Sequence, residues 1–530
     1  MKTICIIGGG ISGLTSAHEL NKLGYNIIVL ERNDIVGGLA RTKQNQKDKI
    51  CPIEYSWRAY GKWYQNVYNV MKEIKINYKE TVYDNLVELQ GGVKTCNKKI
   101  PSYQDTLIKI PLKDKIKLLP SIFNYLISSK KQNIDNYSHI SLKKFIKFKK
   151  LNNYTENLIG KIVGPYLGFD YQNASLYDLY YFFEMYHANS DDSFNFSITK
   201  YPTNYAWFDP WIKQLKSRGV KIYNNVIVNH IIIENNNVIA ILLNNNNFIK
   251  CDYVINCTGP EIYKKLLNPY KNIYKNYYNK ISNVAKFGYQ IQLSIYYYLN
   301  LKIFLNNKNT LAYLPKTPWL LMILPTGHIW GDEFLNKYCD KNIKEVISVG
   351  ICEPYVKGNF IKKKWSDCNK EEIRIEAWHQ LINDNDFINN ICIGNKVTNT
   401  ISDVKILDFK MWSSYKYKNG MTTYEPKWGN NVNTAKYRPK AITPINNLFL
   451  AGSYTDTTTG VYSMESACES GKEAAIKLCE IDKKPNNIYI HKKKTLLLSQ
   501  PFRYINSNLK IFVLIVIFLI IISIVYKILL

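Results

Sequence analysis

Three glycines near the start of the chain, Gly8, Gly10 and Gly13, have the spacing of a phosphate-binding turn. They follow the apolar run at 4–7 and precede a segment with apolar residues at helical spacing. Gly8 permits a sharp turn, Gly10 lets the backbone approach a pyrophosphate, and Gly13 allows a helix to pack closely on a strand. The start of that helix, which includes Ser12, would present free N–H groups to the phosphates. The pattern predicts a dinucleotide site.

An acidic residue follows at the position that such a site requires. The apolar segment 26–30 predicts a second strand, and Glu31 ends it about 20 residues after the glycines. Its carboxylate can accept hydrogen bonds from the hydroxyls of an adenosine ribose. The same charge would repel a 2′-phosphate, so NADP is disfavoured.

The segment after this strand narrows the cofactor to FAD by resemblance. Arg32, the glycine doublet that ends in Gly38, and Arg41 resemble the segment that FAD-dependent amine oxidases and carotenoid desaturases carry at this place. The Arg that directly follows the doublet in those proteins is Leu39 here, which is kept among the expected FAD contacts. Arg41 is then the candidate to serve the pyrophosphate. NAD dehydrogenases usually lack this segment.

A second motif lies near the other end of the chain. The stretch NLFLAGSYTDTTTGVYSMES predicts a strand that ends near Gly452 and a helix that begins at Met464. It resembles the closing motif of the same flavoproteins. The resemblance implies that Gly452 lies beside the ribityl chain and Met464 beside the flavin pyrimidine, and that Val228 holds the adenine through its backbone. The joint presence of both motifs is more specific than either motif alone.

Nearly the whole chain is therefore identified as a member of the FAD-dependent amine oxidase and carotenoid (phytoene) desaturase superfamily. The resemblance implies an α/β fold with a discontinuous, Rossmann-like FAD-binding domain and an interleaved α+β substrate domain. The expected ranges are 1–50, 207–265 and 440–480 for the FAD-binding domain, 51–206 and 266–439 for the substrate domain, and 481–510 for a basic linker. No second G-x-G-x-x-G occurs, so no separate NAD(P)H domain is expected.

The range 511–530 is almost entirely apolar and long enough to cross a bilayer. Tyr526 and Lys527 suit the far interface, and basic residues flank the range upstream at 492–494. By the positive-inside rule, this flank keeps the catalytic body in the cytosol. The sequence predicts a C-terminal transmembrane helix that acts as a single-pass membrane anchor.

The net charge of +28 raises the question of nucleic acid as a partner. The lysines are spread along the chain among Asn, Ile and Tyr, and no Arg-rich helix or zinc finger is present, so nucleic-acid binding is not expected. The seven histidines and eleven cysteines are scattered, without C-x-x-C or H-x-x-x-H patterns. We expect no metal site, and free thiols in a reducing compartment rather than a disulfide framework.

The substrate side of the site is less sharply defined. The segment 54–61 resembles the loop that approaches the flavin in plant-type carotenoid desaturases, which makes Glu54, Trp57 and Arg58 candidates for the active-site wall. A buried ion pair between Glu54 and Arg58 is the alternative interpretation. No general base is assigned.

Two departures from the monoamine oxidases bear on the reaction. Those enzymes bind the flavin through a Cys upstream of the closing motif, and the range 393–467 holds no Cys, so the FAD is expected to be noncovalent. The aromatic pair that surrounds their amine aligns with Met421 and Ser463. Tyr424 and Tyr462 are close enough in sequence to leave that register open.

The leading hypothesis is a membrane-anchored FAD-dependent oxidoreductase, phytoene desaturase-like, that removes hydride from a lipophilic, isoprenoid-like substrate. The first alternative is a flavin amine oxidase that acts on a primary amine or polyamine with oxygen as acceptor. The second alternative is a redox-neutral or non-catalytic flavoprotein. The expected partners are a small lipophilic or amine substrate and a membrane, and oxygen or a quinone would reoxidise the flavin.

Overall fold

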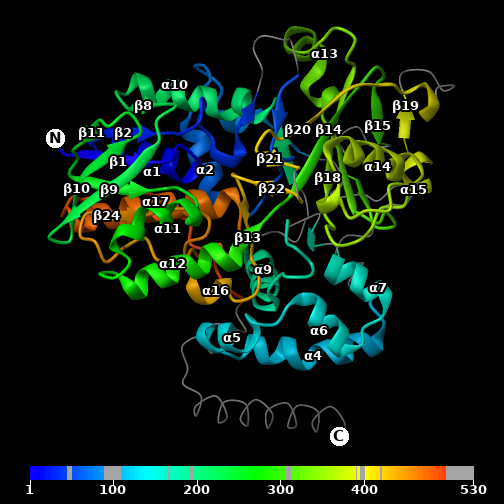
Figure 1. Cartoon of the computed structure of the whole chain (residues 1–530), viewed down its shortest axis with the longest axis horizontal. Coiled ribbons are helices and arrows are strands. Elements are labelled where there is room, and N and C mark those ends of the chain that lie inside the picture. The colour runs from blue at the N-terminus through cyan, green and yellow to red at the C-terminus, as the bar shows by residue number, and fades with distance from the viewer. Residues whose placement is uncertain are drawn as a thin grey trace, which may run out of the picture.

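The structure is a computed structural model (Figure 1), and it describes the residues 1–43, 51–88, 109–161, 163–164, 168–189, 196–305, 312–389, 391–393, 400–417 and 420–496. Its central feature is a five-stranded parallel sheet in the order β24-β12-β1-β2-β8. The strands are β1 (Thr3–Ile7), β2 (Asn26–Leu30), β8 (Lys221–Tyr223), β12 (Tyr253–Asn256) and β24 (Leu448–Leu450). Three distant stretches of chain therefore build one sheet, and both strands predicted for the N-terminal motif are confirmed.

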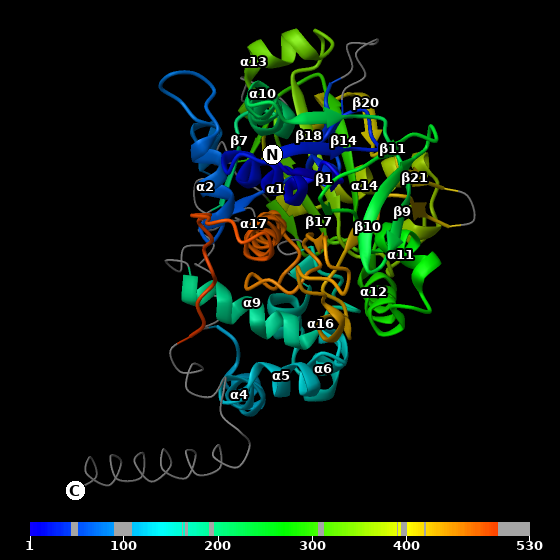
Figure 2. The ribbon, with the colours of Figure 1, turned by 90° about the vertical axis from the view of Figure 1, so that its left-hand side faces the viewer.

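Two helices from opposite ends of the chain cover one face of this sheet. α1 (Ile11–Lys22) follows β1 directly, and α17 (Met464–Ile481) packs against it. The hydroxyl of Ser16 in α1 donates to the carbonyl oxygen of Gly471 in α17 at 3.0 Å. α17 also contacts α2 (Gln65–Glu73). The blue and orange helices lie side by side in both views (Figures 1 and 2).

A small antiparallel sheet stands next to the parallel sheet. It is made of β9 (Val228–Glu234), β10 (Asn237–Leu243) and β11 (Phe248–Ile249). Asn235 and Asn236 form the turn between β9 and β10 with positive φ angles of 47° and 60°, a conformation that Asn tolerates better than most residues. This hairpin places Val228, the first residue of β9, near the carboxyl edge of the parallel sheet.

A second large sheet is antiparallel and belongs to the stretches between the motifs. Its order is β16-β17-β18-β14-β20. The strands are β14 (Leu293–Leu299), β16 (Ala312–Leu314), β17 (Leu321–Pro325), β18 (Glu345–Ile351) and β20 (Ile406–Met411). β14, β17 and β18 are buried along their whole length. Residues of α14 (Lys370–Ile382) pack against one face of this sheet and residues of α13 (Gly327–Tyr338) against the other.

A group of helices lies below both sheets in the view of Figure 1. It consists of α4 (Leu112–Leu126), α5 (Lys130–Tyr137), α6 (Leu142–Lys149), α7 (Asn153–Thr155) and α9 (Leu176–Asn189). The N-cap residue Ser141 accepts a hydrogen bond from the N–H of Lys144 at the start of α6. α9 stands between the lower helices and the rest of the molecule, which allows its aromatic residues to reach the central cavity (Figure 2).

One part of the expected fold class is corrected here. Within the described ranges, no helix combines the length and the apolar character that a bilayer crossing requires. The longest helix of the FAD-motif region, α17, carries Glu465, Glu469 and Lys472 among its buried residues. The predicted C-terminal transmembrane helix, and the single-pass membrane localisation derived from it, are therefore not retained. Their basis was hydropathy at 511–530, which lies outside the described residues, and apolar composition alone does not establish a spanning helix.

The expectation of free thiols throughout is also corrected. Cys51 and Cys339 form a disulfide bond that joins the segment before β4 (Ile53–Glu54) to the end of α13. The two cysteines are 288 residues apart, and nothing in the local sequence of either one indicates the other.

Candidate active site

A cavity of about 760 Å³ opens at the carboxyl edge of the parallel sheet. Ile7 and Leu30, which end β1 and β2, line it, as does Cys257 directly after β12. All of the predicted cofactor-binding residues except Gly13 belong to its lining: Gly8, Gly10, Ser12, Glu31, Arg32, Gly38, Leu39, Arg41, Val228, Gly452 and Met464. Ligands of open α/β sheets bind at this edge, so the location is the one that the sequence predicts.

Two glycines of the motif have different roles: Gly13 allows close packing, and Gly10 faces the cavity. A Cβ on Gly13 would lie 2.0 Å from the carbonyl oxygen of Gly8, so this glycine lets α1 approach the turn after β1. A Cβ on Gly10 would have only the Cα of Gly38 within 4 Å, at 3.7 Å, and would project toward the space that the cavity occupies. α1 has no side-chain cap and no acidic residue in its first turn, so its N-terminal N–H groups are free to meet an anion.

Glu31 is buried at the end of β2 and is held in place by its neighbours. One carboxylate oxygen accepts the N–H of Gly9 at 2.8 Å. The other accepts the backbone N–H of Asn33 at 2.9 Å and its side-chain amide at 2.7 Å. The carboxylate therefore stands beside the glycine turn in the position expected of a ribose acceptor.

Arg41 lies between the glycine doublet and a carboxylate from a distant part of the chain. Its guanidinium donates to the carbonyl oxygen of Gly38 and to Glu425, both at 2.7 Å, and stacks 4.9 Å above the ring of Trp412. The indole N–H of Trp412 donates to the other oxygen of Glu425 at 2.8 Å. Arg41 lines the cavity and is only 4% exposed, and its Nε has no partner among the described residues.

The closing motif forms the opposite side of the cavity. Gly452 follows β24, and its N–H donates to the hydroxyl of Ser470 at 2.9 Å. Met464 is the first residue of α17, and the hydroxyl of Ser463 caps this helix by accepting the N–H of Ser466 at 3.1 Å. Both Gly452 and Met464 line the cavity, so the two motifs that are farthest apart in sequence face the same space.

Beyond the glycines, the cavity has a wall of aromatic and apolar residues, which we call the far wall. It consists of Tyr55, Ser56, Trp57, Arg58, Ala59, Trp63, Tyr64, Val163, Gly168, Phe182, Phe183, Phe196, Gln292, Tyr424, Glu425, Pro426, Lys427 and Trp428. Trp57 and Arg58 are thus wall residues, as the sequence suggests. Glu54 is not in the lining: it lies 3.6 Å from Arg58 and accepts the hydroxyl of Thr42 at 3.0 Å, so the ion-pair interpretation also holds.

Lys427 is the far-wall cation without a carboxylate partner among the described residues. Its ammonium group donates to the carbonyl oxygen of Gly168 at 2.9 Å and to Oε1 of Gln292 at 2.7 Å, and it lies 5.3 Å from the centre of the Tyr462 ring. Burial lowers the pKa of this amine to about 8. Gly168 and Gln292 also line a second cavity of about 240 Å³, so Lys427 stands where the two cavities adjoin.

Glu261 is a second unusual carboxyl group in the lining. It lies in the first turn of α11 (Pro260–Leu267), and its Oε1 has no partner among the described residues. Burial raises the pKa of this group to about 6. Glu261, Glu425 and Lys427 are not among the site residues predicted from the sequence. The only signal for the last two is a pair of charges beside Pro426 and Trp428 within an aromatic stretch.

These features test whether the residues fit FAD. The glycine turns leave room for a phosphate backbone, α1 offers free N–H groups, Arg41 lines the cavity, and Glu31 stands at the ribose position. Cys257 is the only cysteine among the described lining residues, and it lies against Gly8 rather than beside Met464. The donor set suits a dinucleotide, and among the described lining residues no cysteine is placed for a bond to a flavin ring.

Fold and site together define an α/β protein of the Rossmann type with a dinucleotide site at the carboxyl edge of its parallel sheet. Residues 11–479 match the family described as flavin containing amine oxidoreductase. The chain belongs to this family. It is an FAD-dependent oxidoreductase, and its FAD is noncovalent.

Curated relatives match only short parts of the chain. Amine oxidase [flavin-containing] A from Sus scrofa is 34% identical over 93 residues, which cover 17% of each chain. Amine oxidase [flavin-containing] B from Homo sapiens is 34% identical over 90 residues, again 17% of each chain. The chain thus spans about a sixth of the length of these relatives.

Solved structures match over far more of the chain. An oxidoreductase from Methanosarcina mazei has a TM-score of 0.59 at 16% identity, over 90% of this chain and 100% of that one. Cyclohexylamine oxidase from Brevibacterium oxydans has a TM-score of 0.58 at 13% identity, over 91% and 100%. Putrescine oxidase bound to putrescine has a TM-score of 0.58 at 12% identity, over 90% and 99%. At these identities the likeness establishes the fold alone.

Proposed function

We propose that this oxidoreductase removes hydride from a lipophilic, isoprenoid-like substrate that carries no positive charge. The proposal is carried by the far wall, half of whose residues are aromatic. Its cation Lys427, which has no carboxylate partner among the described residues, would repel an ammonium group. An apolar substrate gains from burial against these rings, whereas a protonated amine would lose its hydration beside a like charge.

The residues of the chain have distinct tasks in this proposal. When bound, FAD supplies the acceptor for the hydride equivalent. The glycine turns, Glu31 and Arg41 hold the dinucleotide, and the aromatic far wall orients the substrate and excludes water. We also propose that the expected domain ranges and cofactor contacts apply as the sequence predicts them. Oxygen or a quinone would reoxidise the flavin, because the sequence has no second dinucleotide motif.

Amine oxidation is the second candidate, favoured by the family description and by two tyrosines, Tyr424 and Tyr462, in the cavity lining. The two positions that align with the amine-binding aromatic pair are not aromatic: Ser463 caps α17, and Met421 does not belong to the lining. The ring of Tyr462 is already approached by the ammonium of Lys427. That ring is therefore poorly placed to receive a second cation.

The test begins with the visible spectrum of the purified protein before and after acid precipitation. Colour released into the supernatant is expected, since the FAD is noncovalent. Anaerobic bleaching of the flavin is then measured with a panel of isoprenoid lipids in detergent and a panel of primary amines and polyamines. Bleaching by a lipid and not by amines supports the proposal. Bleaching by an amine alone overturns it in favour of amine oxidation, and a flavin that no donor bleaches supports the redox-neutral alternative.

A further inference from the structure

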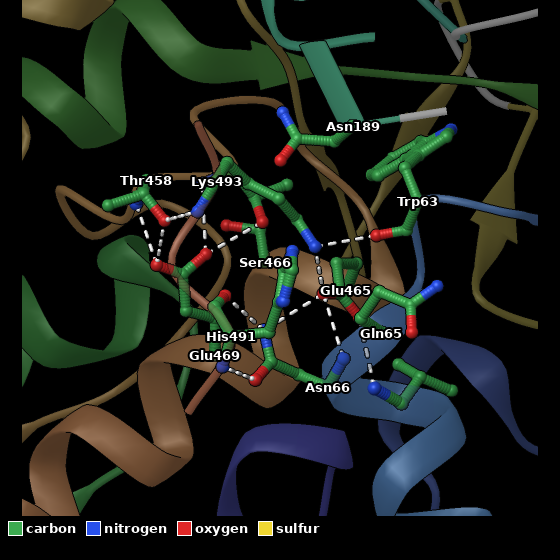
Figure 3. A network of polar contacts seen from close by, with 12 residues as sticks. Trp63, Gln65, Asn66, Asn189, Thr458, Glu465, Ser466, Glu469, His491 and Lys493 are labelled. Carbon is green, nitrogen blue, oxygen red and sulfur yellow. Dashed lines mark hydrogen bonds and ion pairs between the residues drawn. The ribbon is translucent and has the colours of Figure 1, made fainter. Parts of the chain in front are cut away.

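The segment 484–496 follows α17 without forming a helix or a strand, and we call it the strap. It lies against the start of α2, the first turn of α17 and the loop at 457–459 (Figure 3). Its residue Lys493 is 6% exposed, and the side chain is fully buried. Its two neighbours are more exposed. Lys492 has 44% of its side chain exposed, although its ammonium lies 3.2 Å from Glu473 and 3.7 Å from the buried carboxylate of Glu469, and Lys494 is exposed.

The ammonium group of Lys493 connects the first turn of α17 with Trp63. It donates to Oε1 of Glu465 and to the carbonyl oxygen of Trp63, both at 2.6 Å. Figure 3 shows Lys493 pointing inward between these two partners. Glu465 is also fully buried, so the pair is shielded from solvent on both sides.

Glu465 serves at the same time as the cap of α2. Its two carboxylate oxygens accept the N–H groups of Asn66 and Val67, each at 3.0 Å. These are N–H groups of the first helical turn, which have no partner within their own helix. The Glu465 carboxylate thus ties the beginning of α17 to the beginning of α2, and Lys493 neutralises it.

The backbone of the strap is fixed at three points around this pair. The side chain of Asn66 accepts the N–H of His491 at 2.7 Å and donates to its carbonyl oxygen at 3.0 Å. The side chain of Asn189 does the same with Lys494, at 2.8 and 2.9 Å. The N–H of Lys493 donates to the hydroxyl of Thr458 at 2.8 Å. These contacts fix the position of the strap backbone and place the side chain of Lys493 beside Glu465.

The partners of Lys493 connect directly to the cavity. Glu465 follows Met464, and both Met464 and Trp63 belong to the cavity lining. Glu465 lies in the first turn of α17, the helix whose start is predicted to face the flavin pyrimidine. A change in the position of Glu465 would therefore move Met464 and the start of α17.

We propose that Lys493 is a positioning residue of the FAD site, which holds the first turn of α17 and Trp63 in the arrangement that binds the cofactor. The proposal rests on FAD binding in this cavity and not on the identity of the substrate. By linkage, FAD must stabilise the docked strap as much as the docked strap favours FAD.

The experiment measures the dissociation constant of FAD by fluorescence titration of the full-length apoprotein. Lys493→Met leaves the Glu465 carboxylate buried and unpaired, and we expect weaker FAD binding by about 5- to 150-fold. The matched control is Lys494→Met, the exposed neighbour whose printed contacts are made by its backbone, and it should change the constant less than about twofold. Since no substrate is used, failure of the proposed reaction would not affect this result.

A double variant separates charge from bulk. In Glu465→Gln/Lys493→Met no charge remains uncompensated, so we expect FAD affinity to recover toward the wild-type value. Equal dissociation constants for the two single lysine variants would overturn the proposal. So would a Lys493→Met variant that loses only stability to denaturant and binds FAD as the wild type does.

The wild-type chain provides a readout if Lys493→Met does not fold. Trypsin cleavage in the strap is compared with cleavage at Lys271, an exposed residue between α11 and α12 (Lys275–Gly288). Added FAD should slow strap cleavage more than cleavage at Lys271, as linkage requires. Equal slowing at both sites would contradict the coupling between strap and cofactor.

Discussion

Lys427 is a buried amine whose charged form is destabilised by desolvation. This makes the free energy of unfolding depend on pH. Desolvation lowers its pKa from 10.5 to about 8 in the folded chain. Between these two values the unfolded chain holds a proton that the folded chain has released, so stability rises with pH across this window. Below pH 8 Lys427 is protonated in both the folded and the unfolded chain, so its contribution to the free energy of unfolding no longer changes with pH.

The first prediction follows for the variant Lys427→Met. Relative to this variant, the wild-type apoprotein should gain about 3 kcal/mol in free energy of unfolding between pH 8 and 10.5. Denaturant titrations of both proteins across that range measure the difference, which cancels the titration of all other groups. Parallel pH profiles of the two proteins would show that Lys427 titrates as it does in water.

The second prediction contrasts two glycines of one turn. Gly13→Ala places a Cβ at 2.0 Å from the Gly8 carbonyl oxygen and should lower the free energy of unfolding of the apoprotein by at least about 1–3 kcal/mol. Gly10→Ala meets no atom closer than 3.7 Å and should fold nearly as well, but its Cβ enters the cavity and should abolish FAD binding. Urea unfolding and FAD titration distinguish the two effects. Loss of stability in Gly10→Ala with intact FAD binding would refute the division of roles.

At the scale of elements, Glu425 connects the segment after the glycine doublet, through Arg41, with the second half of the chain. It accepts hydrogen bonds from Arg41 and Trp412, and it is as buried as they are. Removal of this carboxylate would leave the guanidinium of Arg41 in the interior without its counter-charge.

The third prediction compares Glu425→Ala with Glu371→Ala. The first should lower the free energy of unfolding by about 3–5 kcal/mol, because it breaks a buried ion pair from one side. The second removes the partner of Arg374 on the surface of α14, where the Glu371 side chain is 53% exposed, and should change stability by less than about 1 kcal/mol. Chemical denaturation at neutral pH measures both. Similar losses in the two variants would mean that the Arg41 contact is dispensable.

Local patterns were sufficient to predict the elements that form the glycine site. β1 and β2 are apolar runs bounded by glycines and an acid, and a buried parallel strand has this signature regardless of what surrounds it. The helix predicted to begin at Met464 is α17, which begins at that residue. The contacts of Lys427, Glu425 and Lys493 could not be predicted, because each depends on a partner far away in sequence whose residue type alone gives no signal.

The fourth prediction concerns the molecule as a whole, since the disulfide between Cys51 and Cys339 closes a loop across the middle of the chain. Without reductant, Cys51→Ser should lower the free energy of unfolding by about 2–5 kcal/mol, and with reductant the variant and the wild type should be equally stable. Peptide mapping under nonreducing conditions should recover the two cysteine peptides joined. Separate peptides from the untreated protein would show that the bond does not form.

The order of strands in the parallel sheet also has a consequence for biosynthesis. β24 is an edge strand of the parallel sheet and pairs with β12, which pairs with β1. The sheet is therefore incomplete until most of the chain has been made. At translation rates of 5–20 residues per second, roughly 20–90 s pass between the synthesis of β1 and that of β24. Once β12 has been made, its edge stays unpaired for roughly 10–40 s at these rates, and the cavity still lacks Gly452 and Met464. We therefore expect FAD to be loaded only after β24 and the start of α17 have been made, and a chaperone that shields open sheet edges should raise the yield of coloured protein.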